Sequence, residues 1–382
     1  MKVRYKYRFY PTDQQQQSLA QLFGCVRVVW NDALSICKAS EKLPSTNDLQ
    51  KIVITEAKKT DERLWLAGVS NIPLQQSVAD LGTAYKNFFD SRNGKRKGSK
   101  MGLPKFKKKH GRQSARFRRG GFSIRNGKVY LAKIGDISPI WSRELPSDPS
   151  SATVIKDAAN RYFLSFVVEI EPVQVDAKNQ SIGIDLGIKT FAAMSNGEMV
   201  KSPDYSKLDK RLRRKQRKLA RQVKGTKRRE KTRLQIAKLH NEITDTRKDF
   251  LHKLSTRVAH ENQVITLEDL NVSGMVKNRR LSRAISMQGW REFRVLCEAK
   301  SEKFGRVFNI ISRWEPTSQI CSDCGYKWGK LDLSIRSVLC INCGAKHDRD
   351  ENAARNIDKV GIGHCHDSKR TRIDRQTTPV AS

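Results

Sequence analysis

The N-terminal residues alternate regularly between apolar and basic side chains. Across residues 2–9, valine and aromatic residues fill the odd positions, and lysine or arginine fills the even ones. A period of two is typical of a β-strand with one buried face, so we predict a strand here with a basic outer face. Thr12 and Gln15 then form a capping-box pattern, which opens a predicted helix through Leu34.

The periodicity changes twice before residue 172. Helical patterning continues to about residue 90. Residues 91–119 carry thirteen Lys/Arg and no acid, and their glycines and proline disfavour a helix, so we predict an extended or looped segment. From 120 to 171 the period returns to two, and Asn126-Gly127 between apolar runs indicates a hairpin. The first strand is therefore separated from its expected sheet by a helical insertion.

The second half of the chain follows a linker at 172–179. It opens with apolar strands at 181–198, which are joined and followed by glycine-containing turns. Residues 207–233 then carry fifteen Lys/Arg, two acids and leucines at helical spacing. We predict a helix that ends near Gly225 and a second helix after it. One apolar stripe beside an almost purely cationic face favours helices that lie along a phosphate backbone over a charge run that is merely solvated.

The charge of the whole chain points to a polyanionic partner. Its 382 residues include 75 Lys+Arg against 39 Asp+Glu, a net charge of +36. Such an excess repels itself in a compact fold unless a polyanion neutralises it, and nucleic acid is the natural candidate. No apolar run approaches the length of a membrane span, and the N-terminus does not resemble a signal peptide. We therefore expect two or three domains, no membrane association and a cytoplasmic location.

Four of the eight cysteines form a metal-binding pattern. Cys321, Cys324, Cys340 and Cys343 are spaced C-x2-C-x15-C-x2-C, with a glycine after each pair. Two such knuckles complete a tetrahedral site for one structural zinc ion, with His347 as a possible substitute ligand. The remaining cysteines are scattered, and three of them are expected to be buried free thiols.

Three acidic residues follow apolar strands or begin a helix. Asp185 ends the strand SIGID, Glu268 ends VITLE, and Asp350 lies near the start of a helix, where it is as well suited to capping as to binding a ligand. Asp185 alone has three readings: a turn-capping residue, a metal ligand of a ribonuclease H-type sheet, or part of the phosphate loop of sugar-kinase and chaperone ATPases. Carboxylates that cluster in a cationic protein favour the second, with two Mg²⁺ ions that act on a phosphodiester.

The chain resembles the TnpB family of transposon-encoded proteins, which are related to type V CRISPR effector nucleases. The similarity covers all but about the last twenty residues. It rests on these segments in order: YRFYPTDQQQ, IGIDLGIKTFAAMSNG, ITLEDLNV, LSRAISMQGWREF, PTSQICSDCG with CINCG, and HDRDENAARNI.

This resemblance implies a fold of two parts, an α/β domain and a β-barrel. The barrel is expected to be of the wedge type, with a helical recognition lobe inserted in it. The α/β part is expected to be a RuvC-like, ribonuclease H-type nuclease domain that carries a zinc ribbon. The implied boundaries are 1–10 with 91–175 for the barrel, 11–90 for the lobe, 176–382 for the nuclease domain, 316–346 for the ribbon, and a disordered tail from about 362.

The implied activity is that of an RNA-guided DNA endonuclease that depends on Mg²⁺. By similarity the catalytic residues are Asp185, Glu268 and Asp350, with Asp348 a weaker candidate than Asp350. The implied partners are a noncoding guide RNA, with one protein chain per RNA, and a double-stranded DNA target beside a short motif. The alternatives are a strand-joining transposase, a guide-dependent repressor without cleavage and a zinc-ribbon RNA-binding protein.

Seven residues are candidate contacts to nucleic acid. Gln75 and Gln76 can read adenine edges in the major groove, although buried or solvated glutamines remain the blander alternative. The others lie in the two cationic tracts, which suit contacts to the phosphate backbone. The complete set is Gln75, Gln76, Lys105, Lys107, Arg211, Arg214 and Lys215.

Overall fold

The fold was taken from a computed structural model of the 382-residue chain. It describes residues 1–96, 100–109, 111–332 and 334–374, although no side chain is described beyond residue 363. The chain divides into two compact units, Met1–Ile170 and Glu171–Ser382, at a boundary just before the predicted linker. Each unit is considered by itself.

The first unit contains two antiparallel sheets. The larger has the order β2-β7-β8-β1-β6, and the smaller has the order β3-β4-β5. The predicted hairpin is confirmed, because Asn126 and Gly127 both adopt positive φ between β3 and β4. The strands are β1 (Lys2–Phe9), β2 (Gln113–Arg118), β3 (Phe122–Arg125), β4 (Lys128–Leu131), β5 (Gly135–Ile137), β6 (Pro139–Ile140), β7 (Ser151–Lys156) and β8 (Tyr162–Glu169).

The helices of this unit lie between β1 and β2 in the sequence, whereas β1 pairs with β8 along its whole length. The Thr12 capping box opens the first helix as predicted, and Tyr7 and Phe9 point into the core. The helices are α1 (Asp13–Ala39), α2 (Thr46–Gln50) and α3 (Asn71–Arg92), with a π-helix at Lys51–Glu56 and 3-10 helices at Ala57–Lys59 and Leu64–Gly68. A closed barrel and a recognition role for these helices stay predictions.

The second unit is built on a mixed sheet of order β11-β10-β9-β12-β13. The first three strands in the sequence form an antiparallel meander, and β12 and β13 run parallel to β9. This order and these directions are those of the ribonuclease H fold, so the RuvC-like part of the predicted fold is confirmed. The strands are β9 (Asn179–Leu186), β10 (Ala192–Met194), β11 (Met199–Val200), β12 (Asn262–Glu268) and β13 (Val307–Ile311).

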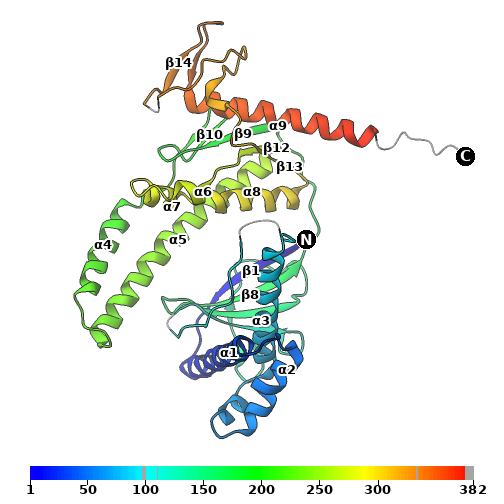
Figure 1. The fold of residues 1–382 in the computed structure, drawn as a ribbon, viewed down its shortest axis with the longest axis vertical. Helices are drawn as coiled ribbons and strands as arrows, with labels where there is room; N and C mark the ends of the chain where they lie inside the picture. Colours follow the sequence, from blue (N-terminus) through cyan, green and yellow to red (C-terminus); the bar gives the residue numbers. More distant parts are fainter. Residues whose placement is uncertain (97–99, 110, 333, 375–382) are drawn as a thin grey trace, which may run out of the picture. The chain divides into compact units, whose positions relative to one another are not determined.

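Helices cover both faces of this sheet (Figure 1). Apolar side chains of α5 (Lys227–Glu261) and α8 (Trp290–Phe304) pack against Ile184 and Ile265 on one face. On the other face, α9 (Arg349–Asp374) crosses β9, β12 and β13. A Cβ atom at Gly183 would overlap the α9 backbone, and one at Gly361 would overlap Thr266. Glycine at these two positions therefore lets the helix lie directly on the strands.

Three further elements complete the second unit. Helix α4 (Ser206–Ala220) packs antiparallel on α5 through a small core that contains Leu212, Leu239 and Ile243. The predicted break between the two helices is at Gly225, whose φ is 88°. Short helices α6 (Val272–Met275) and α7 (Ser282–Gln288) precede α8. The cysteine-rich segment holds a 3-10 turn at Thr317–Gln319 and the hairpin of β14 (Ser337–Leu339) and β15 (Lys346–Asp348).

Two expectations from the sequence concern the C-terminal tail and membrane association. The sequence analysis expects a disordered tail from about residue 362, whereas the structure continues α9 through Asp374. No proline interrupts that stretch, and an isolated glycine costs a helix only about 1 kcal/mol. The expectations for 97–99, 110, 333 and 375–382 lie outside the described residues. Across the helices that the structure describes, none is long and apolar enough to cross a membrane.

Candidate functional site

Asp185 and Glu268 lie side by side at the ends of two parallel strands. In the register of β9 and β12, Ile184 pairs with Leu267, so the next residue on each strand occupies an equivalent place. Side chains alternate between the faces of a sheet. Since Gly183 and Thr266 face α9, Asp185 and Glu268 point to that same face.

Asp350 approaches the same end of the sheet from the first turn of α9. The capping role that the sequence left open belongs to Asp348, whose Oδ1 accepts the backbone N–H of Asp350 (2.9 Å) and of Glu351 (3.1 Å). One carboxylate thus satisfies the free amides at the helix N-terminus. The Asp350 carboxylate is left available for another role.

Asp185 is affected by the other two carboxylates. Burial, and next the charges of Glu268 and Asp350, raise the pKa of Asp185 to about 7. Burial, and next the charge of Asp269, also raise the pKa of Glu268. Like charges that crowd in a poorly solvated place make the ionised forms costly, and a bound cation would relieve that cost. The oxygen-rich donor set fits a hard cation such as Mg²⁺.

Arginines border these carboxylates. Arg336, from the cysteine-rich segment, donates from Nη1 to both oxygens of Asp350 at 3.2 Å. Asp269 accepts from Arg294 (2.8 Å) and pairs with Arg313, and the hydrogen bond from Arg313 is the first cause that lowers its pKa. The sequence analysis missed all three arginines, because no spacing rule links them to the acidic motifs.

The predicted cysteine cluster is present. The sulfur atoms of Cys321, Cys324, Cys340 and Cys343 all lie within 4.8 Å of one another. Cys321 and Cys343 are 3.8 Å apart, and Cys324 and Cys340 are 3.6 Å apart. A tetrahedral ion with bonds of about 2.3 Å to sulfur sets its ligands roughly 3.8 Å apart, so the cluster fits zinc.

The surroundings of the cluster also suit a metal site. His347 is buried with Nε2 3.1 Å from Cys321 Sγ, so it contacts a cysteine of the cluster. Within the described part of the chain, these cysteines are the single group of three or more possible ligands that meet so closely. The three carboxylates stand farther apart than that.

The remaining cysteines are consistent with the sequence analysis. Cys25, Cys37 and Cys297 are buried free thiols, as expected. Cys365 lies beyond the residues whose side chains are described.

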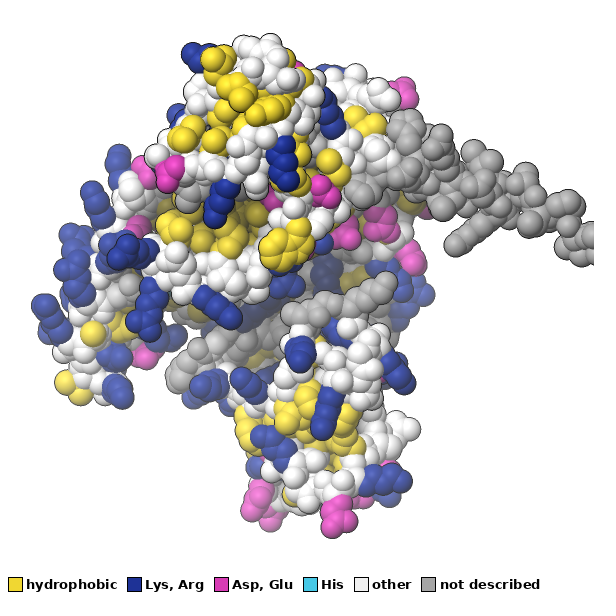
Figure 2. All heavy atoms as spheres, turned by 45° about the horizontal axis from the view of Figure 1, so that its top comes forward, with side chains coloured by type: hydrophobic (Ala, Val, Ile, Leu, Met, Phe, Trp, Pro, Cys, Tyr) yellow, Lys and Arg dark blue, Asp and Glu magenta, His cyan; other side chains and the backbone are white. Residues whose placement is uncertain are grey.

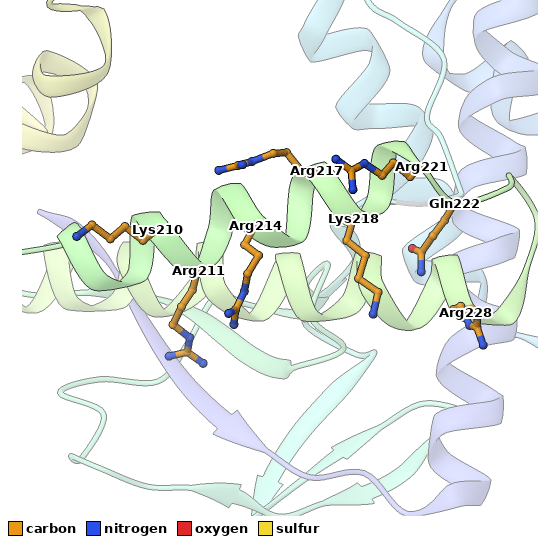
Figure 3. A pocket seen from close by; sticks show the side chains of 8 residues that line it. All are labelled: Lys210, Arg211, Arg214, Arg217, Lys218, Arg221, Gln222 and Arg228. Atoms are coloured by element: carbon orange, nitrogen blue, oxygen red, sulfur yellow. The ribbon is translucent and has the colours of Figure 1, made fainter.

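A strongly cationic hollow lies along α4 and the turn into α5. Its volume is about 910 Å³, and Figure 3 shows the exposed arginines and lysines of α4 around it. Lys and Arg side chains also crowd the surface over the α4–α5 hairpin (Figure 2). The lining residues are Lys210, Arg211, Arg214, Arg217, Lys218, Arg221, Gln222 and Arg228.

Two of the three predicted α4 contacts, Arg211 and Arg214, line this hollow. Lys215 turns to α5 instead, where its Nζ donates to Gln235 Oε1 at 2.8 Å. With about 100° of rotation per residue, position 215 lies on the side of 211 that leads to the buried Leu212, whereas 214 and 218 lie on its other side. The structure therefore divides the predicted tract into a solvent-facing row and a residue that joins the hairpin.

Three of the four candidate contacts in the first unit, Gln75, Gln76 and Lys107, have side-chain partners within it. Gln75 Oε1 accepts from Arg118 at 3.1 Å, and Gln76 Nε2 donates to Asp80 at 3.1 Å. Lys107 holds its ammonium 3.8 Å from the centre of the Trp30 ring, and burial lowers the pKa of this lysine to about 8. The exposed Lys105 offers its carbonyl to the Trp30 indole.

Comparison with known proteins places this arrangement in a family. Residues 165–279 match a family described as "Probable transposase", residues 1–42 a "Helix-turn-helix domain", and residues 290–357 a "Cas12f1-like, TNB domain". A "Putative RNA-guided DNA endonuclease" of Streptomyces pristinaespiralis is 41% identical over 344 residues, which cover 88% of this chain and 84% of the relative. The chain belongs to the TnpB family.

A second TnpB relative supports the same conclusion. The "Putative RNA-guided DNA endonuclease InsQ" of Escherichia coli K12 is 30% identical over 348 residues, which cover 84% of this chain and 83% of the relative. Among solved structures, the "Cryo-EM structure of the Cas12f1-sgRNA-target DNA complex" aligns with a TM-score of 0.49 at 16% identity, over 90% of this chain and 81% of that one. In this TnpB chain, the segment that matches the helix-turn-helix family, residues 1–42, contains one strand, β1, and one helix, α1.

Proposed function

We propose that this TnpB protein is an RNA-guided DNA endonuclease whose catalytic residues are Asp185, Glu268 and Asp350. One observation carries the proposal: three carboxylates from β9, β12 and α9 meet at one end of a ribonuclease H-type sheet, where burial and mutual repulsion raise the pKa of Asp185. The names of the two relatives agree with it.

The three carboxylates would hold two Mg²⁺ ions, which when bound supply an activated water and stabilise the leaving oxygen of a phosphodiester. The chain's own groups prepare that place. Asp348 caps α9 and so sets the position of Asp350. Arg294 and Arg313 hold Asp269, the residue after Glu268, and so fix the end of β12. Arg336 pairs with the Asp350 carboxylate and would release it when a metal cation binds there.

A guide RNA would supply the sequence specificity. The cationic surface of α4 suits a phosphate backbone, and such contacts carry no sequence information. The protein would then recognise the shape of an RNA–DNA heteroduplex and a short flanking motif, with Gln75 and Gln76 as candidate readers. In this proposal residues 11–90 are the recognition lobe, and one chain serves one RNA.

Each of the alternative functions leaves part of the site unexplained. A guide-dependent repressor needs no carboxylate cluster, and a zinc-ribbon RNA-binding protein leaves all three acids without a role. A strand-joining transposase would use the same metal chemistry, so only its products differ. The cysteine cluster is assigned to one structural zinc ion in every case.

The test is cleavage by the protein purified with its RNA. We expect Asp185→Asn, Glu268→Gln and Asp350→Asn each to lower Mg²⁺-dependent cleavage by roughly a thousandfold or more, with non-additive effects, because they share one site. Target binding should be largely retained. Asp348→Asn is the matched control, because asparagine also caps helices well and should preserve most activity.

RNase treatment before assembly should abolish specific double-strand cutting, and a changed guide end should redirect it. RNA-free protein that cuts the same site equally well, or products with joined strands, would favour the transposase instead. Loss of activity in Asp348→Asn with tolerance of Asp350→Asn would overturn the residue assignment.

A further inference from the structure

Trp314 is the most exposed large hydrophobic residue in the described part of the chain. Its relative exposure is 85%, whereas Trp30 and Trp290 are buried. Four of the six tryptophans direct their indole N–H at a backbone carbonyl, namely Trp30, Trp65, Trp141 and Trp328. Among the described ring contacts and hydrogen bonds, the Trp314 indole has none.

A hydrogen-bonded turn anchors the backbone at Trp314. The backbone N–H of Trp314 donates to Ser312 Oγ at 3.3 Å, and that of Glu315 donates to the Ser312 carbonyl at 3.1 Å. Asn356 of α9 holds the carbonyl of Thr317 at 2.8 Å. The ring is thus presented to solvent from an anchored segment.

The turn adjoins the carboxylates. Ile311 pairs with Glu268 in the register of β13 and β12, and its carbonyl accepts the N–H of Asp269. Trp314 follows Ile311 by three residues, a backbone distance of at most about 11 Å. Its neighbour Arg313 pairs with Asp269. Trp314 is therefore an exposed tryptophan on the segment that leaves the strand end paired with Glu268, and it directly follows a cation.

We infer that Trp314 is a stacking platform that positions a base of single-stranded DNA next to the carboxylates. An indole face stacks on any base, so it suits a substrate whose sequence is read elsewhere. Arg313, the preceding residue, supplies a cation next to this platform. The inference rests on the proposed function for its substrate, but it concerns a positioning residue that binds no metal.

The experiment measures binding without cleavage. The intact complex with its co-purified RNA is titrated, in the absence of Mg²⁺, with a short single-stranded oligodeoxynucleotide and with the same strand made abasic. Trp314→Ala should weaken binding of the normal strand by about 5- to 100-fold, as measured for loss of base–aromatic stacking. Trp314→Phe should retain most of the affinity. Trp65→Ala, an exposed tryptophan of the first unit, is the matched control.

The abasic strand separates stacking from altered folding. It should bind the native protein more weakly, and Trp314→Ala should weaken it little further, because the two changes remove the same contact. Quenching of tryptophan emission by the normal strand should disappear in Trp314→Phe and persist in Trp65→Ala. Equal binding by Trp314→Ala and the native protein, or equal losses on both strands, would overturn the inference.

The outcomes also distinguish this inference from the proposed function. Stacking without any cleavage by the native complex would support the platform and contradict the nuclease. Guided cleavage that is unchanged in Trp314→Ala, with no quenching at this residue, would support the nuclease and contradict the platform.

Discussion

At the scale of single residues, neighbouring aspartates have separate tasks. Asp348 and Asp350 differ by two positions, yet one accepts the amides of the α9 N-terminus and the other faces the sheet. Asp185 is the costliest of the group, because burial and two nearby carboxylates oppose its ionisation. A group that destabilises the fold in its ionised form is typical of a functional site.

This cost predicts a pH-dependent effect of Asp185→Asn. The folded protein holds the Asp185 proton up to a pKa of about 7, whereas the unfolded chain releases it near pH 4. Stability therefore falls as pH rises through this interval. In metal-free buffer, Asp185→Asn should be more stable than the native protein at pH 8, by roughly 2 to 4 kcal/mol, and nearly equal at pH 4.

Urea unfolding at the two pH values, with and without Mg²⁺, measures this difference. Magnesium should stabilise the native protein at pH 8 and should have little effect on the variant, because the variant lacks a ligand. A variant that is less stable than the native protein at pH 8 without metal would show that Asp185 is compensated in the fold.

At the scale of elements, α9 links two sites. Its N-terminus carries Asp350, and Asn352 and Asn356 hold the backbone of the cysteine-rich segment at Ile320. Asn352 also accepts the N–H of Ser322, which lies inside the first knuckle. The cysteine-rich segment is therefore anchored to the helix that positions a candidate catalytic residue.

Cys324→Ser should lose the zinc ion, of which the native protein should bind one per chain. Because metal binding and local folding are coupled, residues 316–346 should also lose protection from hydrogen exchange. Metal analysis and exchange measured by mass spectrometry test both effects. Cys37→Ser, a buried thiol outside the cluster, should keep its zinc. Native protein without zinc would contradict the ribbon assignment.

At the scale of the whole molecule, charge determines which partner the protein can bind. The net charge is +36. On α4, Arg211, Arg214 and Lys218 form an exposed row of cations, whereas Lys215 turns toward α5. Counterion release makes binding to such a surface depend steeply on salt.

Replacing Arg211, Arg214 and Lys218 together by glutamine should weaken RNA binding and flatten its salt dependence. Each lost phosphate contact lowers the slope of log K against log salt by about 0.7 to 0.9, so the triple variant should lose roughly two units of slope. Filter binding at several salt concentrations measures this. Lys215→Gln is the control and should keep the native slope. An unchanged slope in the triple variant would exclude this surface as the RNA site.

The sequence by itself determined the elements and much of the chemistry. Capping at Thr12, the Asn126-Gly127 turn, the break at Gly225 and the cysteine spacing are local patterns that act over a few residues, so each could be read directly. The assignment of three distant acids to one site came from resemblance to a family, because spacing alone does not bring residues 185, 268 and 350 together.

Only the tertiary structure decided which side chains share a place. Parallel register sets Glu268 beside Asp185, and the closeness of α9 at Gly183 brings in Asp350. The roles of Lys215 and Arg336 likewise follow from partners in other elements, Gln235 of α5 and Asp350 of α9. Local patterns specify the period and ends of an element, but strand register and helix docking depend on packing across the whole sheet.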